Sequence, residues 1–357
     1  MKIVTVLGAR PQFIKAAAVS RMLARHPDIN EILIHTGQHF DDNMSKVFFD
    51  ELEIPRPHRN LGIHSLPHGS MTGRMLEQLE QVLSEERPDA VLVYGDTNST
   101  LAAALAARKL HLRLAHVEAG MRSFNMNTPE EINRIVTDRL SDLLFCSTKT
   151  AVRNLHREGF KHFDCRIVQS GDVMYDAALY YGKRLQDEPV ALPGTLPPAF
   201  VLCTLHREEN VDDADRLQRI LEGLSDIHQH LPVLLPLHPR TRKRMEAAGG
   251  QWPFILWEPV SYLQMLQLLQ RCALVITDSG GLQKEAFFFG KYCITLREET
   301  EWVELEELGV NYVVGSDRKR IRKAFEKLAG KTMKTKARPY GKGNASEKIV
   351  KSLLKHL

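Results

Sequence analysis

The chain has 357 residues, of which 43% are hydrophobic and 26% are charged, and its formal net charge is +4. This length is enough for about two domains, and no apolar run approaches the ~20 residues that a transmembrane helix requires. The composition therefore excludes intrinsically disordered and membrane-spanning proteins. Charged and proline residues interrupt the first apolar segment too early for a signal peptide, so we expect a cytoplasmic location and no membrane partner.

The cysteines and the basic residues indicate no specific function. The five cysteines lie far apart, mostly within apolar segments, which predicts buried side chains and neither a metal site nor a redox pair. Lysine and arginine gather in residues 318–357, without the motifs or interleaved aromatic residues of a nucleic-acid-binding surface. We interpret this segment as a solvated helix face and expect no nucleic-acid partner.

Short β-branched apolar runs alternate with amphipathic stretches through the first half of the chain. This alternation is typical of βαβ units that build a parallel sheet. Helices are expected over 71–87 and 100–110. The expected strands are 3–7, 31–36, 90–94, 114–117, 143–146 and 167–169.

A proline-rich segment interrupts this pattern. Residues 187–198 contain four prolines and predict a connecting loop. The alternation then resumes, with strands expected at 200–205, 233–237, 254–256, 274–277 and 293–296. The sequence therefore predicts an α/β protein of two Rossmann-like domains, 1–170 and 171–343, with a ligand site in the cleft between them.

Two strand-to-helix turns carry residues that suit anions. Gly-Ala-Arg-Pro at 8–11 opens a helix, where amides, Arg10 and Lys15 could hold a negative charge, although an ordinary turn explains these residues as well. It lacks the further glycines of a dinucleotide fingerprint.

The second turn, Thr-Asp-Ser-Gly-Gly at 277–281, gives the stronger phosphate signal. Ser279 can cap the following helix, and Gly280 and Gly281 allow a close approach of backbone amides to a pyrophosphate. Glu285, on the helix that follows, could accept hydrogen bonds from ribose hydroxyls. The alternative is a tight turn with a helix cap.

Polar residues also follow other strands. His206 and Arg207 come directly after the first strand of the second domain, where they could stabilise a leaving diphosphate or form a loop salt bridge. Asp96 and Glu118 each end a strand of the first domain, and Glu130 follows nearby. Converging carboxylates of this kind favour acid/base chemistry over a purely structural role.

Seven motifs in this order resemble the bacterial non-hydrolysing UDP-N-acetylglucosamine 2-epimerases, and the resemblance covers essentially the whole chain. The motifs are Gly-Ala-Arg-Pro at 8–11, Tyr-Gly-Asp-Thr at 94–97, His-Val-Glu-Ala-Gly at 116–120, Pro-Glu-Glu-Ile-Asn-Arg at 129–134, His-Arg-Glu-Glu-Asn at 206–210, Thr-Asp-Ser-Gly-Gly at 277–281 and Pro-Tyr-Gly-Lys-Gly at 339–343.

The resemblance implies a fold like that of type B glycosyltransferases. The second domain would bind UDP, and a C-terminal helix of about 344–357 would pack back on the first domain. It implies no cofactor and no metal. It also implies a cytoplasmic homodimer that serves the synthesis of cell-envelope polysaccharides such as the O-antigen of lipopolysaccharide.

The family's reaction inverts carbon 2 of a UDP-sugar by eliminating UDP and adding it back. By motif position, the resemblance makes Asp96, Glu118 and Glu130 the acid/base candidates and places His206 beside the departing diphosphate. Arg10 and Lys15 would bind charge in the first domain. The diphosphate and ribose would be held by Ser279, Gly280, Gly281 and Glu285.

Members of the family also bind a second UDP-sugar as an activator. Gln38, His39 and Arg74 match part of that activator site.

Two departures from the common family pattern concern the substrate. Gln12 replaces a glutamate, and Trp302 replaces an arginine in the segment 300–304. Both resemble the branch that acts on UDP-2,3-diacetamido-2,3-dideoxyglucuronate, so we expect that sugar, with UDP-N-acetylglucosamine as the other candidate. Three other functions remain open: a retaining glycosyltransferase of the same fold, a hydrolysing epimerase, and a regulator that binds nucleotide sugars without turnover.

Overall fold

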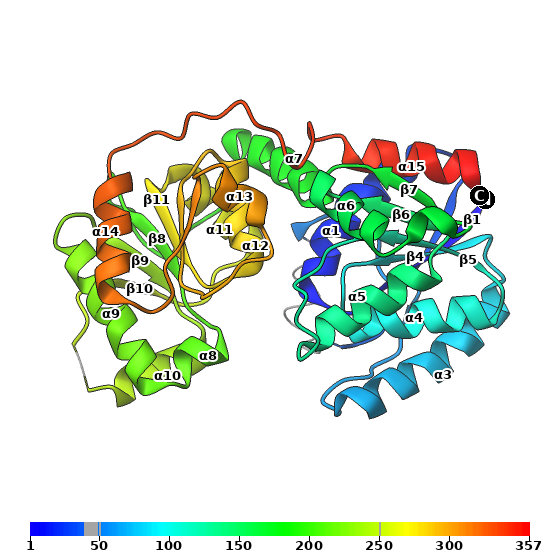
Figure 1. The fold of residues 1–357 in the computed structure, drawn as a ribbon, viewed down its shortest axis with the longest axis horizontal. Coiled ribbons are helices and arrows are strands. Elements are labelled where there is room, and N and C mark those ends of the chain that lie inside the picture. The colour runs from blue at the N-terminus through cyan, green and yellow to red at the C-terminus, as the bar shows by residue number, and fades with distance from the viewer. Residues whose placement is uncertain (39–48, 50, 250) are drawn as a thin grey trace. The chain divides into compact units, whose positions relative to one another are not determined.

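The computed structural model describes residues 1–38, 49, 51–249 and 251–357. The chain forms two compact units, each built on one parallel sheet with helices (Figure 1). Unit 1 comprises Met1–Ala177 and Arg338–Leu357, and unit 2 comprises Ala178–Ala337. This arrangement confirms the predicted α/β class with two Rossmann-like sheets.

The unit boundaries lie at 177/178 and 337/338, against the predicted 170/171 and 343/344. Asp172 explains part of the difference, since its amide donates to the carbonyl of Tyr340 at 3.0 Å. This contact ties the C-terminal segment to unit 1 several residues before the last helix of the chain begins at Ala345. The first boundary falls within helix α7 (Val173–Asp187), whose first turns belong to unit 1.

The sheet of unit 1 has the order β3-β2-β1-β4-β5-β6-β7, with all neighbouring strands parallel. Its inner strands are largely apolar and most of their residues are buried, as expected for a sheet covered on both faces. The strands are β1 (Lys2–Leu7), β2 (Asn30–His35), β3 (Arg59–Asn60), β4 (Ala90–Tyr94), β5 (Arg113–Val117), β6 (Leu143–Cys146) and β7 (Arg166–Gln169).

Amphipathic helices cover this sheet. The buried residues of α3 recur at the three- and four-residue spacing of one helix face. The last helix, α15, packs against α1, and Asp176 accepts hydrogen bonds from the amides of Ala345 and Ser346 at its start. The helices that lie wholly within the described part of unit 1 are α1 (Arg10–Leu23), α3 (His68–Glu86), α4 (Asn98–Lys109), α5 (Pro129–Leu140), α6 (Lys149–Arg157), the 3₁₀ turn Phe160–His162 and α15 (Ala345–His356).

Unit 2 repeats this architecture with the sheet order β10-β9-β8-β11-β12-β13, again parallel throughout. The strands are β8 (Val201–Thr204), β9 (Val233–Pro236), β10 (Ile255–Trp257), β11 (Leu274–Thr277), β12 (Cys293–Thr295) and β13 (Asn311–Val313). The helices are α8 (Glu208–Val211), α9 (Ala214–His228), α10 (Pro239–Ala247), α11 (Tyr262–Arg271), α12 (Gly280–Phe288), α13 (Val303–Glu307) and α14 (Arg318–Leu328).

Each sheet has a point where the strand order reverses. In unit 1 it lies between β1 and β4, and in unit 2 between β8 and β11. Open α/β sheets bind ligands at the carboxyl ends of the strands beside such points. A ligand site is therefore expected at the turns that follow these four strands.

Four of the five cysteines are buried, and all five are free thiols. Within the described part of the chain, no helix is both long and apolar enough to cross a membrane, and no group of three metal-binding side chains is found.

Candidate active site

The Glu118 carboxylate forms an ion pair with the ammonium group of Lys15 at the carboxyl edge of unit 1. Glu118 follows β5 and Lys15 lies on α1, and the two side chains are only 12% and 11% exposed. Gly95, the residue after β4, lies against this pair: a Cβ atom there would be 3.2 Å from Lys15 Nζ and 3.4 Å from Glu118 Oε2. Three segments distant in sequence thus meet at one point.

The backbone of Glu118 is unusual. Its φ is +76°, in the left-handed region that residues other than glycine rarely adopt. Its amide and that of Ala119 both donate to the carbonyl of Phe145, at 3.0 Å each. Such strain tends to persist where the surrounding structure holds a functional side chain in place.

Asp96, beside Gly95, is held by a guanidinium group. Arg134 on α5 donates from Nε and Nη2 to Asp96 Oδ2, at 2.9 and 2.6 Å. Asn133 donates to the carbonyl of Asp96 at 2.9 Å. The carboxylate of Asp96 remains 30% exposed, so it is oriented and still accessible.

The two adjacent glutamates of α5 have different environments. Glu130, the predicted acid/base residue, is exposed in the first turn. Glu131 is buried and accepts hydrogen bonds from the amides of Ser123 and Phe124 and from Arg134 Nη1. Burial raises the pKa of Glu131, but these donors outweigh it and hold the pKa below its usual value. Glu131 and Arg134 belong to the motif at 129–134, but their structural roles were not predicted from the sequence.

The turn after β1 is closed by Gln12. Its Oε1 accepts from the amides of Gly8 and Ala9, at 2.7 and 2.9 Å, and its side chain is buried. Arg10, one of the predicted anion-binding residues, is exposed at the start of α1. Gln12 therefore stabilises the turn that precedes Arg10 from inside the unit.

Two of the predicted activator residues, Gln38 and Arg74, lie on separate segments of unit 1. Gln38 Oε1 accepts from the amide and hydroxyl of Ser99, at 3.1 and 2.8 Å, at the start of α4. Arg74 is exposed on α3. His39 lies outside the described residues.

In unit 2, Asp278 organises the equivalent edge. This buried carboxylate directly follows β11 and accepts from the amides of His206 and Arg207, at 3.0 Å each. His206 Nδ1 lies 3.2 Å from Asp278 Oδ1, and the imidazole is 48% exposed. Asp278 belongs to the motif at 277–281, and its position directly after an apolar strand is the signal from which its role could have been predicted.

The glycine pair of unit 2 lies next to Asp278, at the start of α12. A Cβ atom on Gly280 would overlap the carboxylate of Glu301, whereas one on Gly281 would meet no atom within 4 Å. Ser279 is the N-cap residue of α12, but its side chain makes no capping hydrogen bond. Glu285 is buried on the same helix. The start of α12 thus combines one crowded glycine with one that faces open space.

Trp302 supports the start of α12. Its Nε1 donates to the carbonyl of Gly280 at 2.8 Å, and Lys284 Nζ lies 4.0 Å from the centre of its ring. The side chain is 5% exposed. These contacts give Trp302 a packing role behind the glycine turn.

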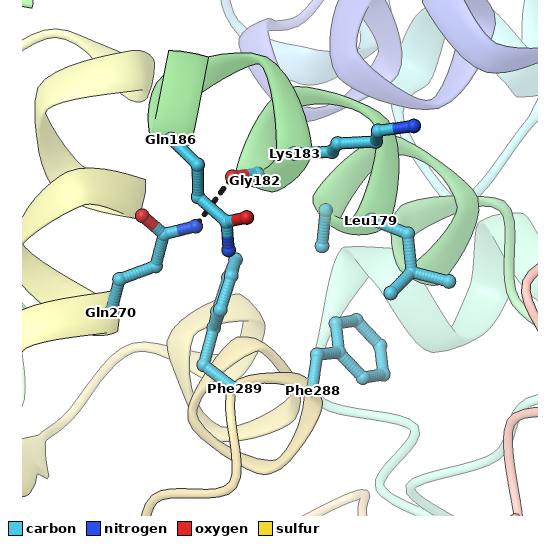
Figure 2. A pocket seen from close by; sticks show the side chains of 8 residues that line it. Leu179, Gly182, Lys183, Gln186, Gln270, Phe288 and Phe289 are labelled. Atoms are coloured by element: carbon cyan, nitrogen blue, oxygen red, sulfur yellow. Dashed lines mark hydrogen bonds between the residues drawn. The ribbon is translucent and has the colours of Figure 1, made fainter. Parts of the chain in front are cut away.

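A surface cavity of about 410 Å³ lies elsewhere in unit 2, between α7, α11 and the end of α12 (Figure 2). Phe288 and Phe289 form one wall, and Gln270 closes another by donating to the carbonyl of Gly182 at 2.6 Å. None of the site residues predicted from the sequence lines this cavity.

Comparison with known proteins agrees with the resemblance seen in the motifs. The family model for UDP-N-acetylglucosamine 2-epimerase matches residues 21–354. The chain is 53% identical to the UDP-2,3-diacetamido-2,3-dideoxy-D-glucuronate 2-epimerase of Pseudomonas aeruginosa, over 99% of this chain and 100% of that protein.

Solved structures of similar proteins extend the agreement to the fold. The crystal structure of the Methanocaldococcus jannaschii UDP-GlcNAc 2-epimerase in complex with UDP-GlcNAc and UDP has a TM-score of 0.89 at 40% identity, covering 99% of this chain and 100% of that one. The Neisseria meningitidis UDP-GlcNAc 2-epimerase bound to UDP-GlcNAc has a TM-score of 0.90 at 31% identity, covering 100% of both chains.

Proposed function

This chain belongs to the family of UDP-N-acetylglucosamine 2-epimerases, and we propose that it inverts carbon 2 of UDP-2,3-diacetamido-2,3-dideoxyglucuronate. The enzyme is thus an isomerase that acts on a UDP-sugar. The observation that carries the choice of sugar is the 53% identity, over both full lengths, to an epimerase of that specificity. UDP-N-acetylglucosamine, the substrate named for more distant relatives, is the second candidate.

The reaction divides into elimination and addition. A carboxylate removes the C2 proton while the bond between C1 and the diphosphate oxygen breaks, and UDP leaves with the bonding electrons. The resulting glycal then accepts a proton at the opposite face of C2, and the diphosphate oxygen attacks C1. One acid/base group is needed at each face of the sugar, which requires at least two carboxylates.

The carboxyl edge of unit 1 supplies these groups in the proposed mechanism. Lys15 orients the Glu118 carboxylate, and Arg134 orients that of Asp96. Glu130 is exposed in the first turn of α5 and is the third acid/base candidate. Arg10 would bind the negative charge of the substrate from the start of α1.

Unit 2 would hold UDP. The amides at Ser279, Gly280 and Gly281 suit a diphosphate at the start of α12, and Glu285 suits the ribose hydroxyls. His206, fixed by Asp278 and about half exposed, would stabilise the charge that develops as UDP departs.

The resemblance supports three further proposals. A second UDP-sugar would bind at the site that includes Gln38, His39 and Arg74. The enzyme would act as a cytoplasmic homodimer. Its product would serve the synthesis of O-antigen or another envelope polysaccharide.

Deuterium incorporation at C2 tests the function. The protein is incubated in deuterated water with each UDP-sugar alone, and the sugar is analysed by NMR and mass spectrometry. We expect exchange at C2 with UDP retained on the product. Exchange with free UDP accumulating would indicate a hydrolysing epimerase, and no exchange without an acceptor would indicate a glycosyltransferase or an inactive binding protein.

A further inference from the structure

His116 is fully buried in unit 1, and both of its ring nitrogens make short contacts. On β5, two residues before Glu118, its Nδ1 lies 2.7 Å from Asp138 Oδ1 and its Nε2 lies 2.7 Å from the carbonyl oxygen of Gly95. A backbone carbonyl can only accept a hydrogen bond, so Nε2 must donate. Asp138 binds the ring at Nδ1 and so fixes its orientation.

The surroundings keep Asp138 ionised. Burial raises its pKa, but hydrogen bonds and charge from His116 and Arg122 outweigh burial and lower the pKa overall. Arg122 Nη1 donates to Asp138 Oδ2 at 2.7 Å, and its other nitrogens bind Glu158. Both oxygens of Asp138 thus have hydrogen-bond partners, as a buried carboxylate requires.

This network holds the backbone on both sides of Glu118. His116 fixes the carbonyl of Gly95, and the Cα of Gly95 lies against the Lys15–Glu118 pair. On the other side, Asp138 Oδ2 accepts from the amide of Gly120 at 3.0 Å. The left-handed residues Gly95, Glu118 and Gly120 are therefore tied to one buried ion network.

We propose that His116 is a positioning residue of the epimerase: held in place by Asp138, it fixes the Gly95 carbonyl and so aligns Glu118 and Lys15 for proton transfer at C2. The proposal rests on the proposed function, because it assigns Glu118 to that transfer. His116 does not itself contact the sugar in this account.

Two single substitutions separate the two contacts of the ring. The amide nitrogen of a glutamine reaches about as far as Nε2, so His116→Gln retains a donor for Gly95. Asparagine reaches only as far as Nδ1, so His116→Asn retains the donor for Asp138 and loses that for Gly95. We expect His116→Asn to lower kcat by about 10²-fold, as misplacement of a reacting group does, and His116→Gln to lower it much less. KM should stay close to that of the wild type in both variants.

A matched control addresses stability. Asp176 is a carboxylate of the same unit that accepts hydrogen bonds from the amides of Ala345 and Ser346 and from the Ser346 hydroxyl, so it fixes the start of α15 rather than a strand end. Asp176→Asn should lower the melting temperature and leave kcat at 25 °C unchanged. Equal kcat for His116→Asn and His116→Gln, or losses that follow melting temperature across all three variants, would overturn the proposal.

Nitrogen-15 NMR of the histidine rings tests the same proposal without turnover. The wild type should show one buried histidine ring whose Nε2 carries a hydrogen-bonded proton, and this signal should disappear in His116→Asn. A His116 ring whose Nε2 carries no proton would overturn the proposal. Absence of C2 exchange in the wild type would instead reject the proposed function, and the NMR result would still decide the state of His116.

Discussion

The side chain of Gln12 donates from Nε2 to the carbonyl oxygen of Tyr94 at 2.7 Å, which joins the first turn of α1 to the end of β4. The same nitrogen lies 3.0 Å from Thr97 Oγ1 and 2.9 Å from Thr100 Oγ1. With Oε1 already bound to the amides of the β1 turn, the amide group is satisfied inside unit 1. These contacts favour a structural role for Gln12 over direct contact with the sugar.

Gln12→Glu should consequently change stability and leave substrate choice unaltered. A carboxylate oxygen would face the carbonyl of Tyr94, and the threonine hydroxyls can compensate only by giving up their present partners. We expect a loss of about 1–3 kcal/mol in the free energy of unfolding, the usual cost of an unsatisfied buried polar group. Urea denaturation measures this loss. A changed ratio of kcat/KM between the two UDP-sugars would show instead that Gln12 acts on the substrate.

The two glycines at the start of α12 should respond differently to alanine. Gly280→Ala must displace Glu301 from its ion pair with Arg297, so we expect a loss of about 1 kcal/mol in stability. Gly281→Ala enters open space and should leave stability unchanged.

Calorimetric measurement of UDP binding tests whether the open space beside Gly281 holds the diphosphate. Gly281→Ala should weaken UDP binding if the diphosphate occupies the space beside that residue. Unchanged UDP affinity in a stable Gly281→Ala variant would move the diphosphate away from this turn.

The fold was predictable because its strands are strongly apolar and its parallel order follows from the helices between them. β4, for example, is fully buried and appears in the sequence as an uninterrupted apolar run, and the equally buried β11 has three apolar residues before Thr277. The strands missed were β3 and β13, which lie at sheet edges. β3 has two residues, both polar, and β13 has three, so neither carries a detectable period.

The site was predictable only in part. The ends of parallel strands meet at one edge, so Asp96 and Glu118 could be placed from sequence, but their partners depend on tertiary packing. Helix α5 shows why: it buries Glu131, Asn133, Thr137 and Asp138, while Ile132 is 42% exposed. Because the buried face of this helix is polar, its hydrophobic pattern does not show which residues face the protein interior. The buried positions of Glu131 and Asp138 could therefore not be predicted from the sequence.

Acid should remove the stabilising effect of Glu131. Its pKa in the folded protein lies below the ordinary value of 4.5, so its contribution is present above that pH and is lost as pH falls through the folded pKa. At pH 7, Glu131→Gln should lower the free energy of unfolding by about 1–3 kcal/mol. The difference from the wild type should shrink below pH 4. A difference independent of pH would mean that packing, not charge, is what Glu131 contributes.

The final prediction concerns the carboxylates that would move protons. Asp96→Asn, Glu118→Gln and Glu130→Gln should each lower turnover by about 10²-fold or more, the usual contribution of a general acid or base. The matched control is Asp142, a carboxylate at the opposite end of the same sheet, where it accepts from the amide of Leu114 at 2.8 Å and pairs with Arg108.

Asp142→Asn should lower stability and leave turnover near that of the wild type, because the amino ends of the strands lie away from the proposed site. C2 deuterium exchange and epimerisation are measured side by side for all four variants. Loss of the carboxylate that removes the C2 proton from one sugar epimer should abolish both exchange and inversion of that epimer. Loss of the carboxylate on the opposite face should block inversion but still allow deuterium exchange into that epimer. If all three site variants keep both signals, the proton-transfer groups lie elsewhere, and the carboxyl edge of unit 1 serves only to bind the substrate.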